Sequence, residues 1–173
     1  MLVDYGRAPE PIRDDVLKKV TAALGIIERF DPRRLQQLAN RGTRILVLTP
    51  IGGHQYDSAG DVIELEARMV ASATAFRLAI SIVHEAAHAR IASLARTTRQ
   101  NTWRVERRCV EEEIAFAHRL TKDQQWLDEW EAAKRAQLQK PWWGFRSRIG
   151  RVAQIVVEHH GDAWYAKLLR HLA

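Results

Sequence analysis

The five residues from His84 to His88 constrain the fold more than any other segment of the chain. They read HEAAH, which matches the pattern H-E-x-x-H, and they lie among alanine, isoleucine and valine residues. Successive residues of an α-helix turn by about 100°, so His84 and His88 stand about 40° apart on one face and can bind one metal ion. Glu85 can then hydrogen-bond a metal-bound water without being a ligand. The segment therefore predicts a core-facing helix over residues 72–96 that carries two metal ligands and an adjacent base.

A metal site of this kind needs a third protein ligand, and the next predicted helix, residues 102–120, carries four glutamates. They are Glu106, Glu111, Glu112 and Glu113. On a helical wheel, Glu106 and Glu113 fall in the middle of the apolar arc, whereas the other two fall outside it or at its edge. A carboxylate on an apolar face is costly to bury unless it is paired or binds a metal. The wheel therefore leaves Glu106 and Glu113 as candidates and makes Glu111 a solvated charge.

The level of each glutamate along the helix pair distinguishes the two candidates. If the two helices are antiparallel about a turn centred near residue 99, Glu113 lies level with the two histidines, and Glu106 lies about one and a half turns nearer the connection. A turn centred at residue 97 or 98 makes them nearly equivalent. We expect Glu113 to be the third ligand, with Glu106 as the alternative. The other glutamate then pairs with an arginine or orients a histidine.

The rest of the sequence predicts one α+β domain, predominantly helical, over residues 1–173. We expect a loose arm at 1–12, helices at 14–30 and 31–42, a metal-site core at 43–120 and C-terminal helices at 121–173, the first of them at 122–139. Within the core, TRILVLTP (43–50) and DVIELEA (61–67) have the composition of strands. Because the residues between them are turn formers, the two strands are expected to form an antiparallel pair.

With these features the chain resembles the gluzincins, zinc peptidases in which HEAAH supplies two ligands and a glutamate on the following helix supplies the third. The small sheet is also similar, since in zincins a strand borders the cleft and pairs with extended substrate. DVIELEA (61–67) is the matching segment. The stretch EEEIAFAHRL (111–120) resembles the glutamate-to-Phe-Ala pattern of the small bacterial ImmA/IrrE-type peptidases. The likeness covers residues 43–120.

The resemblance implies a zinc-dependent metallopeptidase that holds one Zn²⁺ per chain and acts on a peptide or protein. Zinc would lower the pKa of its bound water, and Glu85 would accept the proton and pass it to the leaving amine. A cationic or hydrogen-bonding group is expected to stabilise the oxyanion of the tetrahedral intermediate. The candidates for this group are His54, Tyr56, His159, His160 and Tyr165.

Two alternative functions remain open from the sequence. The first is a zinc-binding protein without activity, although a purely structural site has no use for Glu85 between its ligands. The second is a regulatory or nucleic-acid-binding module, because the formal net charge is +6 and arginines concentrate in residues 90–108 and 140–170. No named nucleic-acid motif accompanies these arginines, and solvated helix faces also explain them.

Composition limits the class of protein further. The hydrophobic fraction of 46% and the charged fraction of 28% are typical of a globular chain, which argues against wholesale disorder. Cys109 is the only cysteine, lies in the apolar arc and is expected to be inert core. No apolar run approaches the ~20 residues that span a bilayer, and no signal-peptide core is visible. We therefore expect a cytoplasmic protein without membrane contact.

Overall fold

The computed structural model of the protein describes residues 3–4, 10–48, 53–94 and 102–139. The elements follow in the order β1 (Val3–Asp4), α1 (Glu10–Phe30), α2 (Pro32–Arg41), β2 (Arg44–Leu48), β3 (Gln55–Asp57), β4 (Val62–Glu66), α3 (Ala67–Ser72), α4 (Ala75–Leu94), α5 (Thr102–Leu120) and α6 (Gln124–Gln139). Helices predominate and the strands form one small sheet, which confirms the predicted α+β class.

The sheet has the strand order β1-β2-β4-β3. β2 pairs with β4 in parallel, with Ile45 opposite Ile63, and β3 pairs with β4 in antiparallel. The predicted antiparallel pairing of residues 43–50 with 61–67 is therefore wrong. The turn-forming segment between them contains a strand of its own, and its turn joins β3 to β4 rather than β2 to β4. As a result β4 is enclosed between two strands, and β3 forms an edge of the sheet.

The two N-terminal helices agree with the prediction except at the start of α1. α1 starts at Glu10 and β1 pairs in parallel with β2, so residues 1–12 are not simply a loose arm. Proline is tolerated in the first turn of a helix because the N–H groups there have no intrahelical partner, so Pro11 does not exclude an early start. α2 begins at Pro32 and ends at Arg41 with Gly42 as its C-cap, in agreement with the predicted range. Gly42 has φ 70°, and its backbone N–H bonds to carbonyl groups of the last turn.

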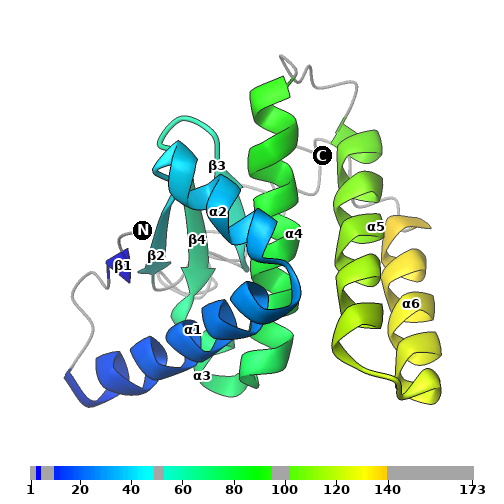
Figure 1. Cartoon of the computed structure of the whole chain (residues 1–173), viewed down its shortest axis with the longest axis horizontal. Coiled ribbons are helices and arrows are strands. Elements are labelled where there is room, and N and C mark those ends of the chain that lie inside the picture. The colour runs from blue at the N-terminus through cyan, green and yellow to red at the C-terminus, as the bar shows by residue number, and fades with distance from the viewer. Residues whose placement is uncertain (1–2, 5–9, 49–52, 95–101, 140–173) are drawn as a thin grey trace, which may run out of the picture.

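α4 is the central element and contains the whole HEAAH motif. Figure 1 shows it between the sheet with α1 and α2 on one side and the α5–α6 pair on the other. Its buried side chains include Leu78, Ile82 and Ala89 on one part of the circumference and Ile80 and Ala87 on the opposite part. A helix that is apolar around most of its circumference is expected at the centre of a domain. The short helix α3 separates β4 from α4, where the sequence predicted only a link.

The later helices agree with the prediction as far as they are described. α5 spans the predicted residues, α6 begins two residues later than expected, and Cys109 is buried. The expected helices beyond residue 139 lie outside the described residues, so the single domain over 1–173 stays a prediction. Among the described segments, no helix is long and apolar enough to cross a membrane.

Candidate metal centre

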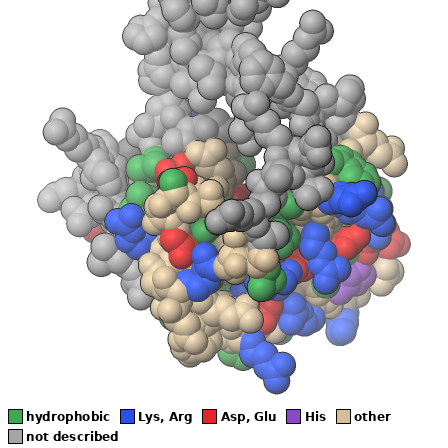
Figure 2. Space-filling view, turned by 90° about the horizontal axis from the view of Figure 1, so that it is seen from above, with side chains coloured by type: hydrophobic (Ala, Val, Ile, Leu, Met, Phe, Trp, Pro, Cys, Tyr) green, Lys and Arg blue, Asp and Glu red, His purple; other side chains and the backbone are tan. Residues whose placement is uncertain are grey.

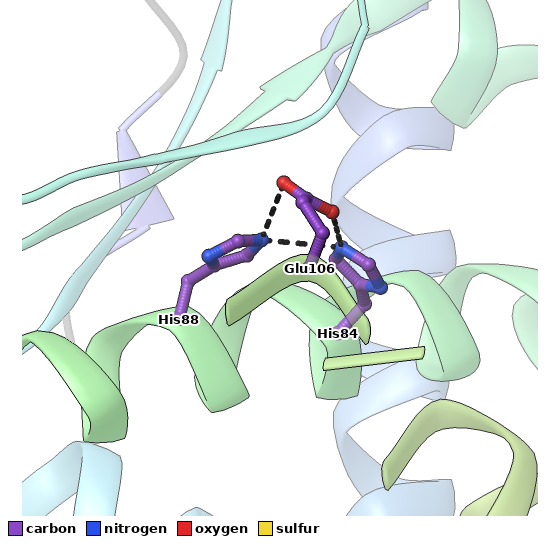
Figure 3. A group of neighbouring side chains, drawn as sticks. All are labelled: His84, His88 and Glu106. Carbon is purple, nitrogen blue, oxygen red and sulfur yellow. Dashed lines mark hydrogen bonds and ion pairs between the residues drawn. The ribbon is translucent and has the colours of Figure 1, made fainter. Parts of the chain in front are cut away.

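The two histidines of the motif project from the same side of α4 toward one point (Figure 3). The Nε2 atoms of His84 and His88 lie 3.3 Å apart, and the two rings are tilted at 59°. Their side chains are 17% and 20% exposed, so the space between them is largely withdrawn from solvent. This is the arrangement that the four-residue spacing predicts.

Glu106 of α5 completes the group. Its Oε2 lies 3.5 Å from Nε2 of His84, and its Oε1 lies 3.3 Å from Nε2 of His88. The three residues each offer one ligand atom within 4.8 Å of the others and could hold a metal ion. Atoms that bind zinc tetrahedrally at about 2.0–2.1 Å lie about 3.3–3.4 Å from one another, and the 3.3 Å between the two Nε2 atoms fits such an ion, while the two Glu106 distances involve its two different oxygens.

Glu113, the preferred third ligand in the sequence, occupies the opposite side of the His84 ring and is not part of the group that could hold a metal ion. Its Oε2 lies 3.0 Å from Nδ1 of His84, whereas the Nε2 atoms face Glu106. Glu113 is 1% exposed, and its Oε1 lies 2.7 Å from Nζ of Lys134, at ion-pair distance but without the alignment of a hydrogen bond. The carboxylate is thus placed to fix the tautomer and orientation of His84.

The argument that favoured Glu113 used only the level of a residue along the helix pair, and this level does not determine which ring nitrogen the residue meets. Both glutamates reach His84, as the helical wheel predicted for residues on the shared apolar face. The ring of His84 has its two nitrogens on different edges, and its side-chain torsions decide that Nε2 points to Glu106. The glutamate not chosen as ligand was expected to orient a histidine or pair with an arginine, and Glu113 takes the first of these positions.

Burial and hydrogen bonding shift the pKa values of His84 and Glu106 in opposite directions. Burial lowers the pKa of His84, but hydrogen bonds with Glu106 and Glu113 outweigh it and raise the pKa to about 10. Burial raises the pKa of Glu106, but bonds to His84 and His88 lower it to about 2. Glu106 is therefore a full carboxylate at neutral pH. A proton and a cation would compete for the Nε2 lone pair of His84.

Glu85 is buried beside the histidines. Its side chain is 6% exposed, and burial raises the pKa of its carboxyl group, while the charges of His84 and His88 act to lower it. A carboxyl group with a raised pKa can accept a proton and return it within one reaction. Glu85 is thus a buried carboxyl group close to the two histidines that is not part of the group that could hold a metal ion.

The candidates for an oxyanion-stabilising group differ in whether the structure already gives their donor a partner. Nδ1 of His54 accepts the backbone N–H of Glu66 at 3.1 Å, and burial, then the charge of Lys134, lower the pKa of His54 to about 4. His54 is therefore neutral at neutral pH and carries its proton on Nε2, where it can donate. The Tyr56 hydroxyl instead donates to Asp61. His159, His160 and Tyr165 lie outside the described residues.

Lys134 is the residue of this site that the sequence did not indicate. It lies on α6, contacts Glu113, and stands 4.8 Å from the ring centroid of Trp130. The sequence of its segment is typical of a polar amphipathic helix. The one available signal was the predicted burial of Glu113, because a buried carboxylate requires a nearby cation or metal. The remaining glutamates serve elsewhere: Glu111 pairs with Arg107 and Arg108 on the surface, and Glu112 pairs with arginines of other helices.

The chain was compared with models of protein families, with curated proteins and with solved structures. None of the three comparisons gives a match. The geometry of the described residues is therefore the basis on which a function can be proposed.

Proposed function

We propose that the protein is a zinc-dependent hydrolase of the metallopeptidase type that holds one Zn²⁺ through His84, His88 and Glu106. The observation that carries the proposal is the set of separations among the two Nε2 atoms and the Glu106 oxygens, 3.3, 3.3 and 3.5 Å. Two imidazoles and one carboxylate are also the donors found in catalytic zinc sites that leave a fourth position open. The bound ion would supply Lewis acidity and lower the pKa of water.

The protein's own residues have separate roles in this proposal. Glu85 accepts a proton from the attacking water and returns it to the leaving amine. Glu113 accepts the Nδ1 proton of His84 and so keeps the Nε2 lone pair directed at Glu106 and His88, while Lys134 balances the charge of Glu113. The Nε2–H of His54 is the available donor for a developing oxyanion among the candidates that the structure describes.

The sheet suggests how an extended peptide would bind. The sequence favoured residues 61–67 as the strand that pairs with substrate, but β4 already pairs with β2 and β3. β3 is the edge strand, packs near α4, and follows directly after His54. An extended peptide that adds to the outer edge of β3 would therefore run beside the motif helix.

The alternative of nucleic-acid binding receives less support from the charges. In the face seen in Figure 2, Lys and Arg side chains are interspersed with Asp and Glu rather than forming a continuous basic area. Arg90, Arg107 and Arg108 are each paired with a glutamate of α5. These pairs account for part of the arginine excess that the sequence showed in residues 90–108.

Metal analysis together with a cleavage assay tests the proposal. Protein purified without added metal is expected to contain about one zinc per chain, and a mixed peptide library is expected to show new termini by mass spectrometry. His84→Ala and His88→Ala should each abolish the bound zinc and the peptide cleavage. Zinc content that is unchanged in both variants would exclude the site. Bound zinc without cleavage of any peptide would instead favour the inactive zinc-binding alternative.

A further inference from the structure

A cavity of about 320 Å³ lies between α2 and α4. Its α4 side is formed by Ala86, Ala89, Arg90 and Ser93. With His84 at zero on a helical wheel, these positions fall between about 140° and 240°, whereas His88 falls at about 40°. The cavity therefore lies on the face of α4 opposite the proposed metal ligands and is a separate site.

Three arginines line this cavity. Among the described residues, no Asp or Glu lines it. Arg34 and Arg41 come from α2 and Arg90 from α4. Their guanidinium groups are half-buried or better shielded, with side chains 14%, 27% and 35% exposed respectively. Three cations that line one partly enclosed space produce a field that attracts an anion.

The carboxylates that pair with these arginines lie outside the lining of the cavity. Arg34 pairs with Asp31 and Glu112, and Glu112 also pairs with Arg90. Arg41 pairs with Asp61.

Two further arginines share the same carboxylates, since Arg119 pairs with Asp31 and Arg108 with Glu112. The three carboxylates therefore divide their charge among several arginines, and none of the three lines the cavity. In addition, Nε of Arg41 is buried and has no hydrogen-bond partner among the described residues. A buried donor without a partner costs free energy that a bound acceptor would recover.

The rest of the lining indicates the kind of molecule that carries the anion. Gln37 and Asn40 present amides and Ser93 a hydroxyl group, while Leu38 and the two alanines are apolar. Small-molecule sites commonly have volumes of roughly 300–1,000 Å³ and combine apolar walls with a few polar groups. Arginine forks match phosphate oxygens in two-point contacts. We propose that this cavity binds a phosphate monoester of a small organic molecule, about the size of a mononucleotide.

Calorimetric titration of the full chain with AMP and with ribose 5-phosphate tests this site directly. At least one of them is expected to bind saturably, with one molecule per chain and more tightly than inorganic phosphate. Adenosine, which lacks the phosphate, should not bind. The proposal is overturned if neither ester binds, if inorganic phosphate binds as tightly as both, or if only a DNA or RNA oligonucleotide binds.

A matched pair of variants distinguishes the cavity from the general positive field. Gln37→Glu places a carboxylate in the cavity from an exposed helix position and removes no charged group, and it should weaken binding about tenfold or more. Ala39→Glu adds a negative charge at an exposed position of α2 that does not line the cavity, and it should change binding less than threefold. An equal effect of both variants would contradict a site in the cavity. Circular dichroism and zinc content, expected unchanged in both, verify that the fold and the metal centre persist.

Discussion

His84 uses its two ring nitrogens for different partners. Nδ1 meets Glu113 at 3.0 Å, and Nε2 faces His88 and Glu106. The sequence predicted that both glutamates lie on the shared face of the two helices, because a wheel depends only on the regular turn of a helix. The sequence could not predict which nitrogen each glutamate meets, because that depends on side-chain torsions set by packing.

Replacement of the glutamates one at a time tests this division. Glu106→Ala removes a proposed ligand and should reduce zinc affinity by several orders of magnitude, since only two protein ligands remain. Glu113→Gln should reduce it about 10–100-fold, because the variant loses a carboxylate that orients His84. Glu111→Ala is the control and should bind zinc normally, since Glu111 pairs only with surface arginines. Competition with a fluorescent zinc chelator measures all three.

The result that contradicts this assignment is easily recognised. If Glu113→Gln lost zinc completely while Glu106→Ala kept normal affinity, Glu113 would be the ligand. The expectation from helix level would then be right, and the arrangement of the carboxylates around His84 would differ in the zinc-bound protein.

Glu85→Gln separates metal binding from chemistry. The amide has nearly the shape of the carboxylate but cannot accept a proton, so we expect normal zinc content and loss of peptide cleavage by at least about 10²-fold. Zinc content and cleavage of the peptide library are measured on the same preparation. Full cleavage would show that Glu85 is not the base, and loss of zinc would give it a structural role.

At the scale of elements, the helices were more predictable than the sheet. α2 follows from Asp31-Pro32 at its start and Gly42 at its end, which are local signals. The pairing of β2 with β4 was not predictable in the same way, because the strand composition of residues 43–50 and 61–67 is compatible with either direction. The three-residue strand β3 decided the direction, and a segment so short carries almost no periodic signal.

The C-terminus of α2 gives a test of this local reading. Gly42 has φ 70°, a conformation that costs a residue with a side chain about 1–2 kcal/mol, so Gly42→Ala should destabilise the protein by about that amount. Gly25 lies inside α1, and a Cβ there would meet no atom within 4 Å. Gly25→Ala should therefore stabilise the protein by about 0.5–1 kcal/mol. Urea unfolding of both variants checks the opposite signs, and equal signs would contradict the assignment of the helix end.

At the scale of the whole molecule, the proposed ligands join two helices that are separate in sequence. His84 and His88 lie on α4 and Glu106 lies on α5, and the residues between these helices are outside the described ranges. The sequence predicted this partnership because HEAAH requires a further ligand. It did not predict that α6 would supply Lys134 behind Glu113, since no local pattern in α6 marks that position.

Removal of the metal should therefore act on the stability of the whole fold. An ion that binds only the folded chain at about 100 times its Kd contributes about 2.7 kcal/mol, which corresponds to roughly 5–10 °C in Tm for a chain of this size. We expect excess EDTA to lower Tm by this amount, measured by calorimetry, and added zinc to restore it. His88→Ala should show no EDTA effect. The same EDTA shift in that variant would place the stabilising ion elsewhere.

The position of α4 between the two sites has a thermodynamic consequence. His84 and Ala86 are two residues apart on α4, and one belongs to the proposed metal site while the other lines the arginine-lined cavity, so a displacement of α4 caused by a ligand at one face would also move the other face. Linkage requires that any such influence be reciprocal: if occupation of the cavity changes zinc affinity by some factor, zinc changes the affinity of the cavity by the same factor. In this fold, one helix would thus make the two binding equilibria interdependent.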